Sequence, residues 1–224
     1  MAYPAKTDRS AILAAAVGIL AQQGLRGMSW RAVAASLGLA PNSLYRYFAS
    51  RKHLEMAVAA EVAGRLHAAL LKTNPEKQAA EKSIRAFAKA YLLFAREQHL
   101  LYEALLVLRP ASGEDAIAPR RLWLFAVGVV SRVSGPKAAQ EATVALWAFL
   151  HGIAALHSAD AFDAEKPFSS SFEFGYRAWM EAARAAASAG AKARRAKPGR
   201  DRARKVKRGG SSLEDKAHNL EEER

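Results

Sequence analysis

The chain has 224 residues, a formal net charge of +13 at pH 7 and no cysteine. The absence of cysteine excludes disulfides, thiolate zinc sites and cysteine nucleophiles. No apolar run reaches the roughly 18 residues that a membrane-spanning helix needs, and the N-terminal stretch MAYPAKTDRS lacks the apolar region of a signal peptide. We therefore expect a cytoplasmic protein that does not enter a membrane.

The positive charge is concentrated in two regions. Residues 1–60 have a net charge of +5, and residues 192–208 have a net charge of +9. Residues 61–191 are nearly neutral at +2, and the last sixteen residues are acidic at −3. Clustered cations are typical of surfaces that bind the nucleic-acid backbone. The two ends of the chain are therefore the candidate regions for contact with DNA.

The first predicted helix precedes residue 25. Its apolar face repeats at helical spacing and consists of Ile12, Ala16, Ile19 and Leu20. Thr7 or Asp8 can cap its N-terminus, because their side-chain oxygens can accept a hydrogen bond from a free backbone N–H of the first turn. We expect Gly24 to end the helix in a left-handed conformation.

Two short helices are predicted to follow across a glycine turn. The first has one apolar face, formed by Trp30, Val33, Ala34 and Leu37. Ser29 can cap it, Gly38 ends it, and Pro41 opens the next helix at a position where its missing N–H costs nothing. Two helices joined by such a turn are typical of a helix-turn-helix.

The second of these helices leaves polar and cationic side chains outside. Leu44 and Phe48 lie four residues apart and are expected to face inward. The residues left largely outside are Asn42, Ser43, Tyr45, Arg46 and Tyr47. These side chains can reach a double helix, so they are the candidate DNA-reading residues.

A long amphipathic helix is predicted from the cap Ser50 onward. Its apolar residues step by four: Leu54, Val58, Val62, Leu66 and Leu70. Arg51 and Lys52 stand in its first turn, where the helix dipole favours carboxylates by roughly 0.3–1 kcal/mol per charge. Either surface exposure tolerates these two cations, or a DNA phosphate lies against this helix end, which is the interpretation we prefer.

Residues 7–66, here called the head, resemble the DNA-binding domain of the TetR/AcrR family of bacterial transcriptional regulators, most specifically in the run LYRYF. The resemblance implies a DNA-binding regulator and places four residues at the major groove: Pro41, Asn42, Ser43 and Arg46. It implies that four further residues bind phosphates: Ser29, Tyr45, Tyr47 and Arg51. We add the neighbouring Lys52 to this set. Lys52 itself departs from the family pattern, in which an acidic residue is common at this position.

Each of these candidates also has a structural explanation. Tyr47 could cover the edge of the core, and Arg46 could be a solvated surface charge. Asn42 and Ser43 could serve only as helix-start residues. The motif as a whole is more specific than any one of these side chains.

Residues 75–189, here called the body, show no strand alternation and predict a helical ligand-binding and dimerisation domain. Turn-forming stretches separate five predicted helices, at 76–97, 100–108, 119–132, 137–158 and 168–189. With four helices in residues 7–72, we expect an all-α protein of about nine helices. It consists of a three-helix helix-turn-helix head, a long connecting helix and the body.

Two stripes of residues in the last predicted helices suggest a homodimer. Small residues line 137–158 and its end, at Ala145, Ala148, Gly152, Ala155 and Ala159. Aromatic residues line 168–189, at Phe168, Phe172, Tyr176 and Trp179, with Met180 beside them. A single domain could bury both stripes internally. The family resemblance instead implies a dimer interface on these two helices, and a twofold dimer would read two half-sites.

The segment ALWAFLHGIAALH resembles the WHG-type C-terminal domain of some of these regulators, which implies a pocket for a small inducer. Candidate lining residues mix apolar walls with a few polar tips: Phe87, Tyr91, Phe94, His99, Tyr102, Trp123, Phe125, Trp147 and His151. Most of them could equally be ordinary core. Charged residues are sparse between 122 and 158, which favours an apolar or aromatic inducer.

We expect residues 190–224 to form a disordered tail, basic and then acidic, because it cannot bury enough apolar surface to fold alone. The basic part could add phosphate contacts or could be merely solvated. No glycine-rich phosphate loop, nucleophile elbow or metal-ligand spacing is present, so we expect neither an enzyme nor a cofactor. The alternative function is an architectural protein that binds DNA irrespective of sequence through the head and the tail.

Overall fold

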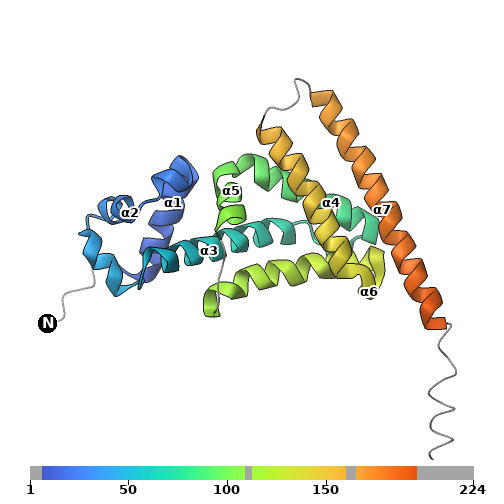
Figure 1. The fold of residues 1–224 in the computed structure, drawn as a ribbon, viewed down its shortest axis with the longest axis horizontal. Helices are drawn as coiled ribbons and strands as arrows, with labels where there is room; N and C mark the ends of the chain where they lie inside the picture. Colours follow the sequence, from blue (N-terminus) through green and yellow to red (C-terminus); the bar gives the residue numbers. More distant parts are fainter. Residues whose placement is uncertain (1–6, 109–112, 160–164, 196–224) are drawn as a thin grey trace, which may run out of the picture.

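The computed structural model describes residues 7–108, 113–159 and 165–195 (Figure 1). The regular elements within these ranges are all helical, which confirms the predicted all-α class. The N-terminal elements are α1 (Arg9–Gly27), α2 (Trp30–Ser36), the 3₁₀ helix η1 (Pro41–Arg46) and α3 (Arg51–Leu71). The later elements are η2 (Pro75–Lys77), α4 (Ala80–Glu97), α5 (His99–Val107), η3 (Gly113–Ala116), α6 (Ile117–Ser158) and α7 (Glu165–Arg195).

The predicted caps of the first three α-helices are present. The backbone N–H three residues further on donates to the side-chain oxygen of each cap, which are Asp8, Ser29 and Ser50. Gly38 lies in the turn before η1 with φ of 63°, as the sequence predicts. Gly24 also has a positive φ, 67°, but it kinks α1 instead of ending it, because a further turn continues to Gly27.

Within the described residues, the nine expected helices correspond to α1, α2, η1, α3, α4, α5, the two arms of α6 and α7, and the short 3₁₀ helices η2 and η3 are additional. The chain kinks at Gly135, where φ is 74°, and Pro136 then opens the second arm. Proline is tolerated there because its missing N–H falls in the first turn of the new arm. The predicted DNA-reading helix differs in type, since Pro41–Arg46 forms a 3₁₀ helix and not an α-helix. At the other end, α7 continues to Arg195, past the boundary expected near residue 190. Most of the predicted tail, residues 196–224, lies outside the described residues.

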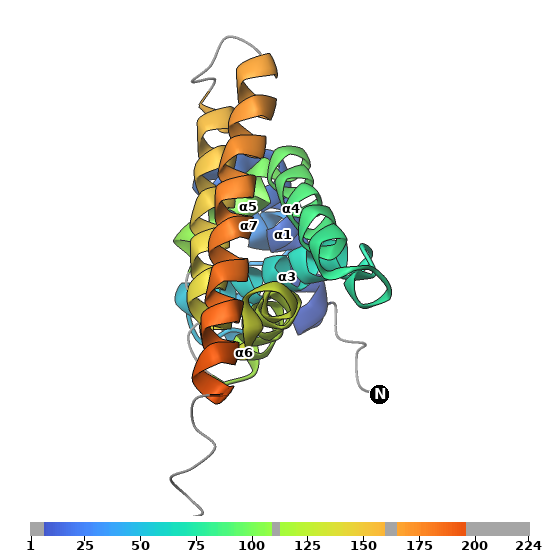
Figure 2. The same ribbon diagram turned by 90° about the vertical axis from the view of Figure 1, so that its right-hand side faces the viewer.

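The helices are arranged along one long axis (Figure 1). α1, α2 and η1 lie at one end, and α3 runs from them between α5 and the first arm of α6. The second arm of α6 and α7 lie side by side at the other end, as Figure 2 also shows. Buried apolar residues form one continuous cluster from Ile12 to Ala183. Head and body therefore share a core, and α3 belongs to both.

The stripe on α3 explains this shared core. Leu54 and Val58 are 2% and 0% exposed and pack within the head, while Leu66 and Leu70, both 0% exposed, pack within the body. A second link joins the two parts outside the core. The guanidinium of Arg9 on α1 lies 4.6 Å from the centre of the Phe48 ring and 3.6 Å from a carboxylate oxygen of Asp115.

The connection between α3 and α4 is held by Arg132, near the kink of α6. Its guanidinium donates to the carbonyl oxygens of Pro75 and Gln78, each at 2.5 Å, and to the hydroxyl of the fully buried Ser83 at 3.0 Å. Charge-assisted bonds of this kind are among the stronger ones in proteins. The connection between α3 and α4 is therefore fixed against α6.

Candidate DNA-binding surface and ligand cavity

The 3₁₀ helix η1 is fixed to the head by buried residues on one side and by Trp30 on the other. Leu44 and Phe48 are 0% and 2% exposed. The indole N–H of Trp30 donates to the carbonyl oxygen of Pro41 at 3.0 Å, and its ring lies 4.8 Å from that of Tyr45. Trp30 thus orients the reading helix in addition to packing on its own face, a role that the apolar pattern alone did not indicate.

The predicted major-groove residues lie on the outer side of η1. Pro41, Asn42 and Arg46 are exposed, and Ser43 is half-buried. In the part of the chain that the structure describes, the side chains of Asn42 and Arg46 have no hydrogen-bond or ion-pair partner. These two side chains are therefore free to bind base edges, whose bidentate recognition suits an amide or a guanidinium.

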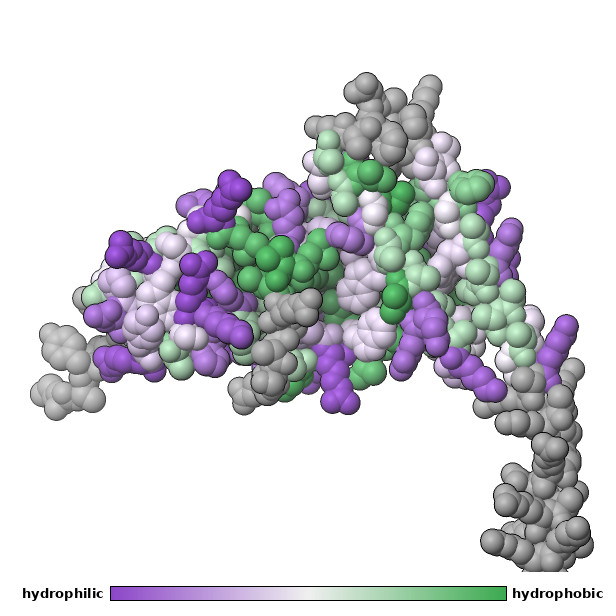
Figure 3. All heavy atoms as spheres, viewed as in Figure 1, coloured by the Kyte–Doolittle hydropathy of each residue, from purple (hydrophilic) through white to green (hydrophobic). Residues whose placement is uncertain are grey.

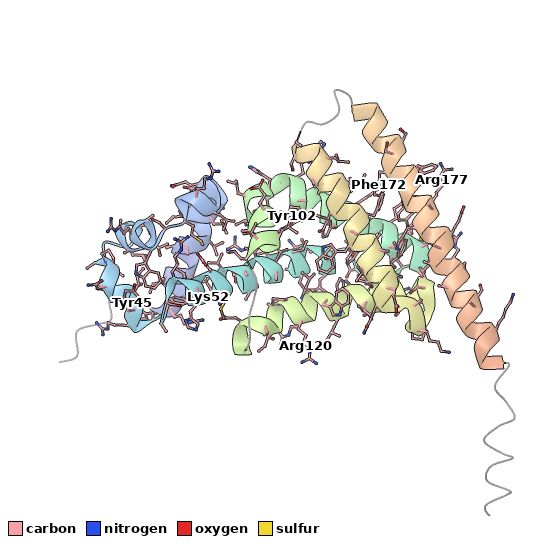
Figure 4. All side chains as sticks on the ribbon, viewed as in Figure 1. Tyr45, Lys52, Tyr102, Arg120, Phe172 and Arg177 are labelled. Carbon is pink, nitrogen blue, oxygen red and sulfur yellow. The ribbon has the colours of Figure 1, made fainter. Side chains whose placement is uncertain are left out.

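Among the predicted phosphate ligands, Tyr45 and Tyr47 differ. The Tyr45 side chain is 57% exposed and lies at the outer end of the head (Figure 4). Tyr47 is half-buried, and its hydroxyl donates to the carbonyl oxygen of Thr7 at 3.0 Å. The Tyr47 hydroxyl therefore ties the end of η1 to the start of α1. A DNA phosphate could accept a hydrogen bond from the Tyr47 hydroxyl only if it replaced the bond to Thr7.

The first turn of α3 contains the remaining cations. Arg51 forms an ion pair with Glu55 one turn later, with 2.7 Å between Nε and Oε1. This pair gives a structural reason why a cation is tolerated at this helix end. The neighbouring Lys52 is exposed and has no partner among the described residues. Ser29 accepts the Ala32 N–H at 3.1 Å, which leaves its own hydroxyl proton available to a phosphate.

The body contains a small apolar cavity of about 10 Å³, surrounded by four helical segments. Its lining residues are Leu66, Leu70, Phe87, Tyr91, Leu122, Ala126, Val130, Thr143, Leu146, Trp147 and Leu150. This volume is close to the minimum that holds one water molecule. The cavity therefore has to enlarge before it can take up a ligand, since ligand pockets usually measure about 300–1,000 Å³.

Three of the nine predicted pocket residues line this cavity, namely Phe87, Tyr91 and Trp147. Sequence reasoning missed the aliphatic lining residues, because a leucine in a pocket wall has the same pattern as a leucine in a core. The two from α3 could have been found, since the stripe that starts in the head continues to Leu66 and Leu70.

The other six predicted pocket residues do not line the cavity. Tyr102 and His151 are joined to Tyr91 behind it by hydrogen bonds. The remaining four are not among its lining residues either. Trp123 stacks on Trp147, Phe125 packs between His67 and Phe87, Phe94 is buried in the core, and His99 is exposed at the start of α5.

The polar residues near the cavity form a hydrogen-bonded relay from α4 through α5 to α6. The Tyr91 and Tyr102 hydroxyl oxygens are 2.9 Å apart, and the Tyr102 hydroxyl lies 2.8 Å from Nδ1 of His151. Burial raises the pKa of both tyrosines, since a phenolate would lose its hydration there. Both therefore remain neutral donors and acceptors at physiological pH.

The two predicted dimer stripes have different environments. On α7, Phe172, Tyr176 and Trp179 are buried, and the Trp179 indole N–H donates to the Ala142 carbonyl of α6 at 3.0 Å. The aromatic stripe therefore packs within the subunit, whereas Phe168 lies outside the described side chains. The small stripe on α6 is largely exposed. Val144 and Leu156 on the same arm are exposed apolar side chains, and Phe174 on α7 is exposed as well. Figure 3 shows mostly pale surface, which is of intermediate hydropathy, along the second arm of α6 and α7.

In the ranges 7–108, 113–159 and 165–195, no three histidine or carboxylate side chains are grouped closely enough to hold a metal ion. No helix in those same ranges is both long and apolar enough to span a bilayer.

Comparisons with known proteins agree with this geometry. Residues 12–58 match the family model described as bacterial regulatory proteins, tetR family. Residues 84–179 match the model described as tetracyclin repressor-like, C-terminal domain. A relative from Bacillus subtilis (strain 168), the uncharacterized HTH-type transcriptional regulator YobS, is 25% identical over 170 residues, which cover 75% of this chain and 88% of that protein.

Solved structures share the fold. A protein of unknown function from Rhodococcus sp. RHA1 is similar with a TM-score of 0.65 and 24% identity, covering 79% of this chain and 97% of that one. A possible TetR family transcriptional regulator from Streptomyces coelicolor A3(2) is similar with a TM-score of 0.58 and 20% identity, covering 80% and 99%. With a TetR-type model matched in the head and another in the body, the chain belongs to the TetR family and is a DNA-binding transcriptional regulator.

Proposed function

We propose that this regulator is a homodimeric repressor that binds a specific operator and is released by a small apolar or aromatic inducer. It acts in the bacterial cytoplasm, where it has access to the chromosome. The observation that carries the proposal is that α3 belongs to the core of both the head and the body. One end of this helix packs against α1 of the head, and the other end lines the cavity.

In the proposed complex, η1 enters the major groove. Asn42 and Arg46 read base edges together with Pro41 and Ser43, because their side chains are exposed on that side. Ser29, Tyr45 and Lys52 contact phosphates, and Arg51 joins them when its ion pair with Glu55 opens. Phosphate contacts position the head, and base contacts supply the specificity.

The proposed inducer acts by enlarging the cavity. Leu66 and Leu70 line the cavity, so a ligand that separates its walls displaces α3. Leu54 and Val58 on the same helix then carry the displacement into the head core. The ligand must bind the displaced state more tightly than the DNA-binding state, because equal affinity for both shifts no equilibrium.

The proposed dimer uses the second arm of α6 and α7, as a four-helix bundle. The exposed small stripe on α6 allows a second subunit to approach closely, and Phe174, 72% exposed, supplies an apolar anchor. A twofold dimer presents two reading helices to half-sites about 34–36 Å apart or a multiple of that distance. The functional units proposed within each subunit are residues 7–66 for DNA and residues 75–189 for ligand and dimerisation.

Competition gel shifts test the proposal and its architectural alternative. The full chain is bound to DNA from around its own gene in about 0.15 M salt. Salt at this concentration weakens sequence-independent contacts with phosphates. Unrelated DNA then serves as competitor. Retention of the specific fragment supports an operator-binding regulator. Equal loss to any competitor favours an architectural protein that binds through the head and the basic tail.

A further inference from the structure

The cavity of the body comes close to the surface at one of its lining residues. The eleven residues that line it all belong to the described part of the chain, and ten of them are buried. Trp147 is the exception, since it is half-buried. A path from solvent into the cavity therefore displaces the fewest buried side chains if it passes the Trp147 ring.

Trp147 is covered by a second indole, that of Trp123. The two rings are stacked, with ring centres 6.1 Å apart and an angle of 23° between their planes. Trp123 is half-buried as well and is not one of the lining residues. Aromatic pairs attract each other by more than the burial of their surface provides. The pair therefore holds the cavity closed at the lining residue that solvent reaches.

The two indoles are held differently. The Trp147 side chain hydrogen-bonds to the Tyr91 hydroxyl, which is itself bonded to Tyr102, so Trp147 is tied to the relay. The Trp123 side chain has no hydrogen-bond partner among the described residues. The stacking contact can therefore break by a movement of Trp123 while Trp147 keeps its place.

The two rings also belong to different arms of α6. Trp123 lies on the first arm and Trp147 on the second, and the arms diverge from the kink at Gly135 (Figure 1). Pro136 has no N–H, so a helical hydrogen bond is missing where the arms meet. Both arms also line the cavity. A small increase in the angle between the arms therefore separates the indoles and widens the cavity at the same time.

We propose that Trp123 and Trp147 form a gate through which ligands enter the cavity, between the two arms of α6. The rings are stacked in the closed state. In the open state the arms have moved apart and Trp123 has left Trp147, so that small molecules reach the lining residues. The role of this gate in regulation rests on the proposed function, which takes the cavity as the inducer site. Its opening is a property of the chain itself and can be measured without a ligand.

A thiol in the cavity wall reports how often the gate opens. Thr143 lines the cavity and is 2% exposed, and the chain has no cysteine of its own, so Thr143→Cys introduces a single buried thiol. The full chain with this substitution is treated with methyl methanethiosulfonate, a small neutral thiol reagent, and mass spectrometry follows the modification. A gate exposes little surface, so we expect a labelling rate that stays constant at low urea concentrations. Labelling through global unfolding would instead rise steeply with urea.

Two further substitutions, each combined with Thr143→Cys, locate the opening. Trp123→Ala removes one ring of the pair and should raise the labelling rate without urea about tenfold, the value of a strong aromatic pair. Phe149→Ala is the matched control. It also removes a half-buried ring of α6 from a stacked pair, since Phe149 stacks on Phe172 with ring centres 5.8 Å apart, but Phe149 does not line the cavity. This control should label at the rate of Thr143→Cys alone.

Three results would overturn the proposal: labelling of Thr143→Cys that rises with urea as steeply as unfolding at every concentration, an unchanged rate with Trp123→Ala, or an equal acceleration by Phe149→Ala. The urea series on Thr143→Cys decides the question even where Trp123→Ala does not fold. Neither DNA nor inducer enters the labelling assay. A failed gel shift therefore contradicts the proposed function alone, and any of the three labelling results contradicts the gate alone.

Discussion

The head and the body place their candidate functional side chains in opposite environments. On η1, Asn42 and Arg46 are exposed and have no partner within the described residues. In the body, Tyr91 and Tyr102 are 2% and 5% exposed and are bonded to each other. The head can therefore meet DNA without rearranging its core, whereas the apolar cavity of the body must open before it can admit a ligand.

This difference shows where the cost of regulation lies. A reading surface that is already in place can bind its target at once, while a closed cavity must be opened against the packing of its walls. Because α3 is one of those walls and also part of the head core, the opening cannot stay local. In the proposed mechanism, the body deforms when it binds the inducer, and α3 carries the head along with it.

The largest expected effect concerns the part of α3 that lines the cavity. Leu66→Ala should lower the free energy of unfolding by about 2–5 kcal/mol, because Leu66 is fully buried and its removal enlarges a cavity. Leu71→Ala, on the same helix but 47% exposed, is the matched control, with an expected change within about 0.5 kcal/mol. Urea unfolding measures both. Similar losses for the two variants would mean that α3 is not a shared core element.

The next effect concerns the reading surface. Arg46→Ala should cost about 1–3 kcal/mol of binding free energy at one base position and relax discrimination there. Lys52→Ala should instead weaken binding to all sequences alike and reduce the salt dependence, as expected of a phosphate contact. Quantitative gel shifts over a panel of operator variants measure both. If the two variants behave identically across the panel, the proposed division of roles is wrong.

Alkaline pH should probe the relay. Burial raises the folded-state pKa of Tyr91, so its contribution to stability is present below the ordinary tyrosine value and is lost as pH rises. Above about pH 10, such a tyrosine ionises in the unfolded state but not in the folded state. Each one should therefore lower the free energy of unfolding by up to about 1.4 kcal/mol per pH unit. Thermal melts between pH 8 and 11 should therefore fall less steeply for Tyr91→Phe than for the unchanged chain. Parallel curves would contradict the burial of an un-ionised Tyr91.

The smallest expected effect separates the two explanations for Arg51. Glu55→Gln removes an ion pair between residues four apart that contributes about 0.3–0.5 kcal/mol, and it frees the Arg51 guanidinium. If Arg51 contacts phosphate, the variant should bind all DNA sequences slightly more tightly while being slightly less stable. Unchanged affinity, together with the stability loss, would leave Arg51 with a structural role only.

Much of the head could be predicted from the sequence, since local rules determine it. The caps Ser29 and Ser50, the turn glycine and the inward direction of Leu44 all follow from short-range spacing, and the structure has them as expected. The packing of Tyr47 against Thr7 could not be predicted, because it joins residues forty positions apart. The 3₁₀ form of η1 was missed for a similar reason, as spacing alone does not separate it from a short α-helix.

The body was less predictable. Its helices followed from periodicity and turn residues, including the break at Gly135. Its cavity did not, because the apolar pattern shows that a residue is buried without showing what it faces. Trp147 and Phe87 line the cavity, whereas Phe94 does not, although all three have the same kind of sequence environment. Which aromatic residue meets a cavity depends on how the helices pack across long separations in sequence.

The most direct test of the account is the distance between the two heads of the dimer. The chain has no cysteine, so Gln22→Cys, at an exposed position on α1, carries one spin label per subunit without further substitution. Pulsed electron resonance then gives the distance between the labels with operator DNA and with an aromatic compound that releases the DNA. We predict one narrow distance on DNA and a shifted distance with the ligand. An identical distance in both samples would contradict coupling of cavity and head through α3, and the absence of a measurable distance would contradict the dimer.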